Sequence, residues 1–158
     1  MQLIGILHDI RSVHNVGSIF RTADGAGFSK LYLCGITPAP LDRFKKVRPD
    51  FAKVALGAEK SMAWESVPDT VALIQKLKSE GWEILALEQS KKSMPLMSLE
   101  DIGRRNCALI VGNEVDGIPP LVLKLADHIL EIPMFGKKES LNVSVAFGIA
   151  AYELQFRK

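Results

Sequence analysis

Short apolar segments alternate with helical segments along this 158-residue chain, and no other feature constrains the fold as strongly. Six of these apolar segments have the length and composition of strands, and several carry no polar residue on either face. They occupy residues 3–7, 30–35, 62–65, 82–87, 107–111 and 128–132. The alternation predicts an α/β domain whose mostly parallel sheet is flanked by helices. Such sheets bind ligands outside the carboxyl ends of their strands.

Helical spacing of apolar residues predicts helices over residues 15–26, 51–60, 69–80 and 120–126, and a further one from about residue 143. Asn15 is expected to cap the first of these helices. The last helix is nearly all apolar over its first turns, so it is expected to be buried. We expect both its own sheet and a second subunit to cover it.

Composition excludes several classes of protein. Apolar residues make up 47% of the chain and charged residues 24%, which is typical of a globular domain. No apolar run approaches the ~20 residues of a membrane span, and no secretory signal is visible, so a soluble cytoplasmic protein is expected. Cys34 and Cys107 lie in apolar runs and are expected to be buried, which leaves no disulfide framework and no metal site.

The net charge is only +2, so a polyanionic partner must be held by a local patch of charge. One such patch lies on and just beyond a long loop with prolines at positions 38, 40 and 49. Five basic residues, interleaved with Phe44 and Phe51, oppose the single acid Asp50; they are Arg43, Lys45, Lys46, Arg48 and Lys53. Loops of this length are often functional.

The first helix carries a polar motif at its start. Gly17 and Arg21 share a helix face, so the guanidinium is expected to lie over the bare turn at Gly17 and reach toward Asn15. A planar cation at that place suits a phosphate or a carboxylate. The alternative is a surface arginine paired with Asp24, and spacing alone slightly favours that alternative.

Two further motifs follow buried strands. Gly112 and Gly117 bracket Asn113, Glu114 and Asp116, a loop that can approach a ligand closely or simply turn into a helix capped by Asp116. Ser140 and Asn142 stand at the mouth of the C-terminal helix, where either can cap it or help to orient an anion. The dinucleotide glycine fingerprint, the phosphate loop and the esterase elbow are all missing from the sequence. These absences disfavour a nucleotide-binding oxidoreductase.

Taken together, the three motifs resemble those of the SpoU-type RNA ribose 2′-O-methyltransferases of the SPOUT superfamily. The residues that carry the resemblance are Asn15-x-Gly17-x-x-x-Arg21-x-Ala23, Gly112-Asn113-Glu114-x-x-Gly117-Ile118, and Ile132-Pro133-Met134 with Ser140-Leu141-Asn142-Val143-Ser144-Val145-Ala146. The resemblance implies a C-terminal trefoil knot and a homodimer with a shared active site. We expect residues 1–158 to form a single methyltransferase domain that departs from larger relatives in having no separate RNA-binding domain before Leu3.

The resemblance also implies S-adenosylmethionine as cofactor, held around Leu87, Gly112, Ile132, Ser140 and Leu141. By the same resemblance, Arg21 belongs at methyl transfer, as a base assisted by an RNA phosphate or as a cation that anchors this phosphate. Asn15 would orient Arg21 or the RNA, and Glu114 would fix the loop and the groups around Arg21. Ser140 and Asn142 would shape the cofactor and ribose pocket.

The substrate implied is structured RNA, most simply tRNA, with ribosomal RNA as the alternative. A knotted RNA-binding module without catalysis is a further alternative, which the presence of Arg21, Glu114, Ser140 and Asn142 disfavours. The residues expected to contact RNA are Arg11, His14, Arg43, Lys45, Lys46, Arg48, Lys53, Lys137 and Lys138. Such contacts to phosphates position RNA but do not read its sequence.

Overall fold

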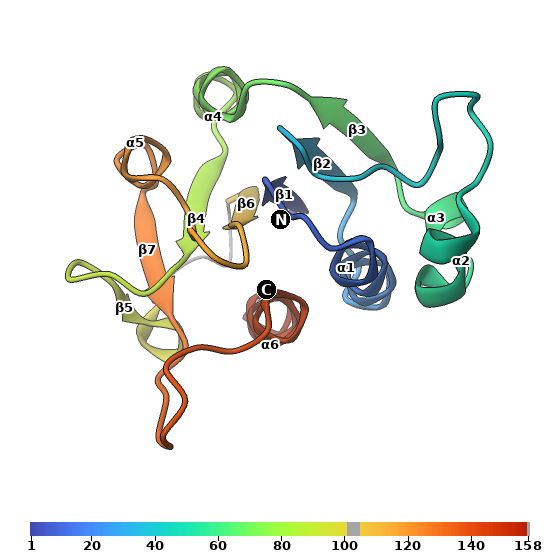
Figure 1. Ribbon diagram of the computed structural model, residues 1–158. Helices are drawn as coiled ribbons and strands as arrows, with labels where there is room; N and C mark the ends of the chain where they lie inside the picture. Colours follow the sequence, from blue (N-terminus) through green and yellow to red (C-terminus); the bar gives the residue numbers. More distant parts are fainter. Residues whose placement is uncertain (101–104, 158) are drawn as a thin grey trace.

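A seven-stranded sheet forms the centre of the molecule in the computed structural model, which describes residues 1–100 and 105–157 (Figure 1). Its order is β3-β2-β1-β6-β4-β7-β5, and all neighbouring strands pair in parallel. The strands are β1 (Leu3–His8), β2 (Lys30–Cys34), β3 (Trp64–Val67), β4 (Glu83–Leu87), β5 (Met94–Pro95), β6 (Cys107–Val111) and β7 (His128–Glu131). The predicted α/β class with a parallel sheet flanked by helices is confirmed.

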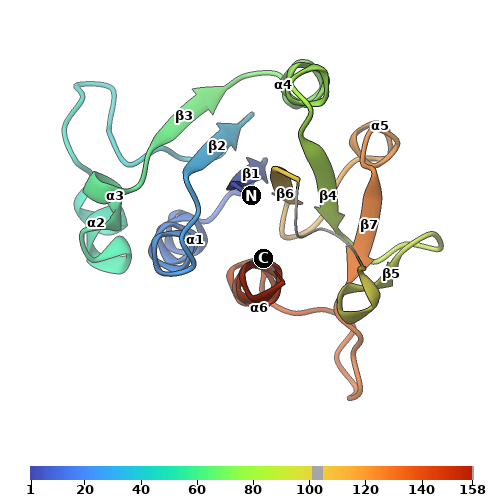
Figure 2. The same ribbon diagram turned by 180° about the vertical axis from the view of Figure 1, so that it is seen from behind.

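Helices cover both faces of this sheet (Figures 1 and 2). They are α1 (Val13–Gly25), α2 (Pro49–Ala55), α3 (Ala58–Ser61), α4 (Thr70–Ser79), α5 (Pro120–Leu123) and α6 (Val143–Phe156), with a 3₁₀ turn at Leu96–Ser98. One face carries α1 and α6, with α2 and α3 packed beside α1, and the other carries α4 and α5. The central strands β1 and β6 are buried on both faces, which explains their unbroken apolar sequences.

Two apolar cores result, one on each face of the sheet. Phe20, Phe51 and Phe147 lie fully buried in the core under α1 and α6, and Ile74 and Ile84 lie in the core under α4 and α5. Alternate residues of β1 enter opposite cores, because successive side chains of a strand point to opposite faces.

Three local predictions need correction. The N-cap of α1 is Ser12, whose hydroxyl accepts a hydrogen bond from the amide of Asn15, so Asn15 lies inside the helix. The helix expected over residues 51–60 is two helices, since Leu56 and Gly57 adopt left-handed conformations with φ of 50° and 100°. The strand expected at residues 62–65 begins at Trp64 and pairs with β2.

The C-terminal helix α6 is only half covered by its own chain. Its inner face buries Phe147, Ala150, Ala151 and Leu154. Its outer side leaves Val145 50% and Tyr152 44% exposed, so its own chain covers only one side of the helix, and cover of the other side by a second subunit stays a prediction.

Cys34 and Cys107 are buried in β2 and β6 as predicted. Burial raises the pKa of Cys34 to about 11 and that of Cys107 to about 12. Among the described residues, no helix is both long enough and apolar enough to cross a membrane.

Candidate active site and RNA-facing surface

A pocket of about 530 Å³ opens where β4, β6 and β7 end. This is the edge at which parallel sheets bind ligands. The pocket is lined by residues of four segments, namely Leu87–Gln89, Val111–Gly117, Glu131–Ile132 with Met134, and Ser140–Val143 with Ala146. All five residues predicted for the cofactor lie in this lining: Leu87, Gly112, Ile132, Ser140 and Leu141.

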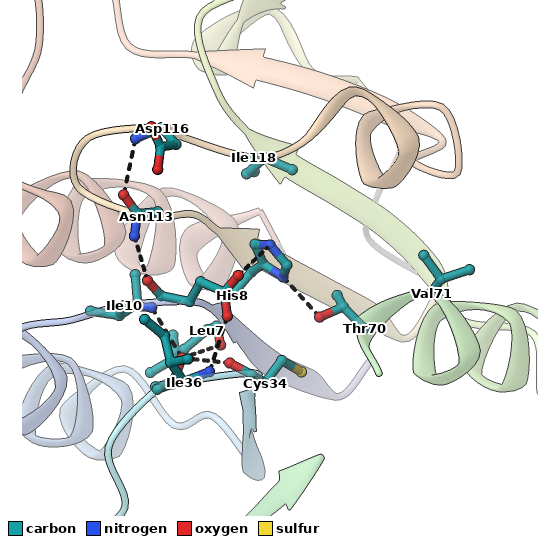
Figure 3. Close-up of polar contacts among 12 residues, drawn as sticks. Leu7, His8, Ile10, Cys34, Ile36, Thr70, Val71, Asn113, Asp116 and Ile118 are labelled. Carbon is teal, nitrogen blue, oxygen red and sulfur yellow. Dashed lines mark hydrogen bonds and ion pairs between the residues drawn. The ribbon is translucent and has the colours of Figure 1, made fainter. Parts of the chain in front are cut away.

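The loop after β6 forms a tight turn against the pocket. A Cβ atom at Gly112 would lie 2.5 Å from the backbone carbon of Gly117, so no larger residue fits at position 112. The side-chain oxygen of Asn113 accepts hydrogen bonds from the amides of Val115 and of Asp116, the second of which Figure 3 shows. Its Nδ2 donates to the carbonyl of Asp9. Asn113 therefore holds the loop in shape and joins it to the end of β1.

The alternative in which Asp116 caps the following helix is wrong. The N-cap of α5 is Pro119, and no side chain among residues 1–100 and 105–157 makes a capping hydrogen bond to this helix. Asp116 instead lies 3.9 Å from the guanidinium of Arg11.

Glu114 connects this loop to the start of α1. Its carboxylate accepts hydrogen bonds from the amides of Arg11 and Ser12, at 3.0 and 3.1 Å, and from Nδ2 of Asn15 at 3.1 Å. Partial burial pushes the pKa of Glu114 upward, but the hydrogen bonds outweigh it and hold the pKa below its usual range. A fixed negative charge thus sits at the entrance to α1.

Asn142 joins the third motif to the other two. It is the N-cap of α6, and its Oδ1 accepts from the amide of Ser144 at 2.9 Å. Its Nδ2 donates to Oδ1 of Asn15 at 3.1 Å. Of the two candidate caps, Asn142 fills this role, and Ser140 lines the pocket. Glu114, Asn15 and Asn142 form one hydrogen-bonded chain through the three motifs.

Glu88 is a pocket residue that the sequence reasoning missed. Its carboxylate accepts hydrogen bonds from the amides of Ile118 and Gln89, at 2.8 and 2.9 Å, and so fastens the loop after β6 to the end of β4. A Cβ at Gly117 would lie 2.4 Å from this carboxylate. The available signal was its position: an acid directly after Leu87 at the end of an apolar strand.

Arg21 lies away from this pocket. It is exposed on α1 and lines a second, more open hollow together with His14, Lys53 and Tyr152. The turn at Gly17 is not bare as expected, because α2 covers it: a Cβ there would lie 3.1 Å from Cβ of Val54. Among the described residues, Arg21 makes no hydrogen bond to Asn15 and no ion pair with Asp24.

The remaining basic candidates lie in three places. Lys137 and Lys138 are exposed between β7 and α6, and Arg11 is exposed before α1. Arg43, Lys45 and Lys46 project from the loop between β2 and α2, whereas the Arg48 guanidinium is paired with Asp50 at 2.9 Å. The described residues contain no group of three or more His, Cys, Asp or Glu side chains suited to a metal ion.

Comparison with known proteins identifies the family. The SpoU rRNA Methylase family matches residues 2–152. This chain belongs to that family. The resemblance drawn from the three motifs is confirmed, and with it the expectation of an RNA 2′-O-methyltransferase at the level of the family.

Relatives of known activity modify tRNA or rRNA. The chain is 33% identical over 153 residues to the tRNA (guanosine(18)-2′-O)-methyltransferase of Aquifex aeolicus, which covers 97% of this chain and 68% of that protein. It spans only 57–58% of the length of several 23S rRNA (guanosine-2′-O-)-methyltransferases, such as that of Bordetella pertussis at 32% identity.

Solved structures share the fold. An AdoMet-bound rRNA methyltransferase from Sinorhizobium meliloti matches with a TM-score of 0.88 and 26% identity, over 98% of this chain and 56% of that one. A structure described as giving insights into the 2-OH methylation of C/U34 on tRNA matches with a TM-score of 0.79 and 27% identity. That match covers 97% of this chain and 93% of the other.

Proposed function

We propose that this chain methylates the 2′-hydroxyl of a ribose in structured RNA, with S-adenosylmethionine as methyl donor. One observation carries the proposal: the second and third family motifs line one pocket, and Asn15 of the first motif joins them through hydrogen bonds to Glu114 and Asn142. The family and the AdoMet-bound relative from Sinorhizobium meliloti support the same reaction.

The residues of the pocket fit this cofactor. The volume of about 530 Å³ lies within the range of about 300 to 1,000 Å³ typical of small-molecule sites. The lining contains apolar residues such as Leu87, Val111 and Ile132, which suit the apolar faces of an adenosine. Four carboxylates line the pocket, those of Glu88, Glu114, Asp116 and Glu131, and negative charge favours a sulfonium cation. The cofactor supplies an electrophilic methyl group when bound.

The chain's own contribution is then orientation and charge. An in-line displacement depends mostly on how the ribose oxygen is held against the methyl group. Ser140 and Asn142, on the pocket wall, are placed to shape the ribose site, and Glu114 and Asn15 hold Asn142 from behind. Arg21 serves as a phosphate anchor, which its permanent charge suits, or as a base that an RNA phosphate assists.

We further propose a homodimer in which Arg21 of one subunit completes the pocket of the other. Arg21 does not line the pocket of its own chain, so a second copy is needed to bring it there. The exposed apolar side of α6 supports this arrangement, since Tyr152 on that side lines the same hollow as Arg21. Pairing through α6 would cover the apolar surface that the single chain leaves in water.

We propose tRNA as the substrate, with ribosomal RNA as the alternative. The Aquifex aeolicus relative acts on tRNA, and the tRNA-related structure is matched over 93% of its own length. The larger rRNA-modifying relatives support the alternative.

A single domain over residues 1–158 would hold the RNA on its own basic surface. We further propose the C-terminal knot that the resemblance of the three motifs implies, and a cytoplasmic location, which an RNA substrate of this kind supports.

The test is a pair of measurements on the full chain. S-adenosylhomocysteine should raise the melting temperature, because a ligand of the folded state stabilises it by RT ln(1 + [L]/Kd). Labelled methyl groups should appear in tRNA at an alkali-resistant position. A thermal shift without incorporation into tRNA or rRNA would favour the non-catalytic RNA-binding module, and no shift at saturating ligand would count against the methyltransferase itself.

A further inference from the structure

A short hairpin between β2 and α2 presents an aromatic ring at the tip of the basic loop. This loop projects from the edge of the molecule beyond β3 and α2 (Figure 1). Leu41 and Val47 form an antiparallel bridge, and the amide of Arg48 donates to the carbonyl of Pro40 at 2.9 Å. The two arms of the hairpin are therefore paired, although the loop lies outside the sheet.

Asp42 fixes the tip. Its Oδ1 accepts hydrogen bonds from the amides of Phe44 and Lys46, at 2.8 and 3.0 Å. Its carbonyl accepts from the amide of Lys45, and its own amide donates to the carbonyl of Lys46. Lys45 closes the turn in the left-handed region, with φ of 59°. A non-glycine residue rarely adopts this conformation, and it persists where the surroundings over-determine the backbone.

Phe44 is the residue that this turn displays. Its side chain is 67% exposed, although leaving an apolar phenylalanine ring in water is unfavourable. The guanidinium carbon of Arg43 lies 4.7 Å from the ring centroid, so a cation already stands over the ring. The exposed fraction means that most of the ring's surface remains open to a further planar group.

The charges around the ring select the kind of partner. Arg43, Lys45 and Lys46 flank Phe44 on both sides in sequence, and all three are exposed. Asp42 is the acid within this tip, and its Oδ1 accepts hydrogen bonds from two backbone amides. An exposed aromatic ring among cations matches unpaired RNA, in which bases stack on the ring and phosphates meet the cations.

We propose that Phe44 stacks on an unpaired nucleobase of the substrate RNA, with Arg43, Lys45 and Lys46 contacting the adjoining phosphates. This inference rests on the proposed function, because it assigns a surface to the RNA of that reaction. It restricts the substrate to an RNA that offers a single-stranded loop or bulge within reach of the hairpin. The cations alone would bind duplex and single strand alike; the ring adds the preference for an unpaired base.

The experiment compares binding of a short single-stranded RNA with binding of a duplex of the same sequence, by fluorescence anisotropy without cofactor. Phe44→Ala should weaken single-strand binding about tenfold and leave duplex binding unchanged, since stacking contributes about 1–3 kcal/mol per base. Phe44→Leu keeps an apolar side chain without a π-face and should resemble Phe44→Ala. Phe44→Tyr and Phe44→Trp should restore single-strand binding. By contrast, Lys45→Ala with Lys46→Ala should weaken both RNAs and flatten the salt dependence by about two charges.

Several outcomes would overturn the proposal. Equal losses for duplex and single strand in Phe44→Ala, or full binding by Phe44→Leu, would remove stacking as the cause. A change in sedimentation of Phe44→Ala would make the ring a contact between protein subunits. The proposed function is tested separately, by methyl incorporation into RNA with the unaltered protein. If RNA binding depended on the Phe44 ring but no methyl group were transferred, the stacking proposal would stand and the proposed methyltransferase activity would be wrong.

Discussion

Asn142 donates a hydrogen bond to Asn15 across 127 positions of sequence, with 3.1 Å between the side-chain nitrogen and oxygen. Asn15 is buried, and its side-chain nitrogen Nδ2 donates a hydrogen bond to the carboxylate of Glu114. Each of its two polar side-chain atoms therefore has one partner, and each partner belongs to a different motif. The geometry of the pocket mouth depends on this one buried amide.

Replacing Asn15 by alanine should lower the free energy of unfolding by about 1–3 kcal/mol, because Glu114 and Asn142 each lose a partner at a partly buried site. Methyl transfer should fall with it. Urea denaturation measures the first effect, and a control is Asn106→Ala, which removes a hydrogen bond to the exposed amide of Gln2. Equal stability losses in the two variants would show that the buried chain adds nothing specific.

Replacing Glu114 by glutamine should destabilise the protein most at neutral pH. The hydrogen bonds hold the folded-state pKa of Glu114 below the ordinary value of 4.5. The charged form therefore contributes stability above that value, and this contribution is lost as the pH falls through the folded-state pKa. Denaturation from pH 7 to pH 3 should show the two proteins converging. A difference that stays constant over this range would exclude the charge of Glu114 as its source.

Substituting alanine for Gly112 should abolish binding of S-adenosylhomocysteine and cost about 1–3 kcal/mol of stability, as overpacking does. The added Cβ meets backbone at Gly117, which cannot move without opening the loop. Gly136→Ala is the matched control, since a Cβ there meets nothing within 4 Å. Calorimetric titration of both variants with S-adenosylhomocysteine checks the prediction. Retained affinity in Gly112→Ala would mean that the loop can move to accommodate the added Cβ, and the prediction would be wrong.

Arg21→Ala should eliminate methyl incorporation into tRNA while the thermal shift with S-adenosylhomocysteine persists. Arg21 lines the second hollow and not the cofactor pocket, so the two measurements should separate. Arg21→Lys keeps the charge but loses the planar fork, and it should recover little activity if two groups are held at once. Unchanged incorporation by Arg21→Ala would exclude this residue from the reaction.

Ile149→Asp should dissociate the proposed homodimer. Ile149 lies 36% exposed on the uncovered side of α6, and a carboxylate there would be trapped in an apolar interface. Sedimentation equilibrium should find a monomer. Leu121→Asp, at a 63% exposed leucine of α5 on the opposite face of the sheet, should leave the assembly intact. If the unaltered chain is already monomeric, the dimer proposal fails at once.

Short unbroken apolar runs that alternate with helical segments predicted the sheet, because β1 and β6 are buried on both faces. The local pattern misplaced Asn15, since a cap and a buried amide look alike in sequence. Ser12 is the cap, and the side chain of Asn15 bonds to residues 99 and 127 positions away. Glu88 was missed for the same reason: its partner amide belongs to Ile118, thirty positions on. The surroundings of Arg21 depend on the packing of α2 over Gly17. This packing joins segments that are far apart in sequence, so no local sequence pattern could predict it.

The central pairing of the sheet sets the order in which the chain can be completed. Leu3 of β1 is paired with Cys107 of β6, so one edge of β1 has no neighbour until 104 further residues have been made. At ribosomal rates of 5–20 residues per second, this is a wait of roughly 5 to 20 s. Meanwhile β2 can satisfy the other edge of β1, but the apolar segment Leu3–His8 keeps an open edge, which is the kind of surface that recruits chaperones or aggregates. During synthesis, the chain therefore passes through an interval in which β1 is open to aggregation, although β1 has a neighbour on both edges in the finished sheet.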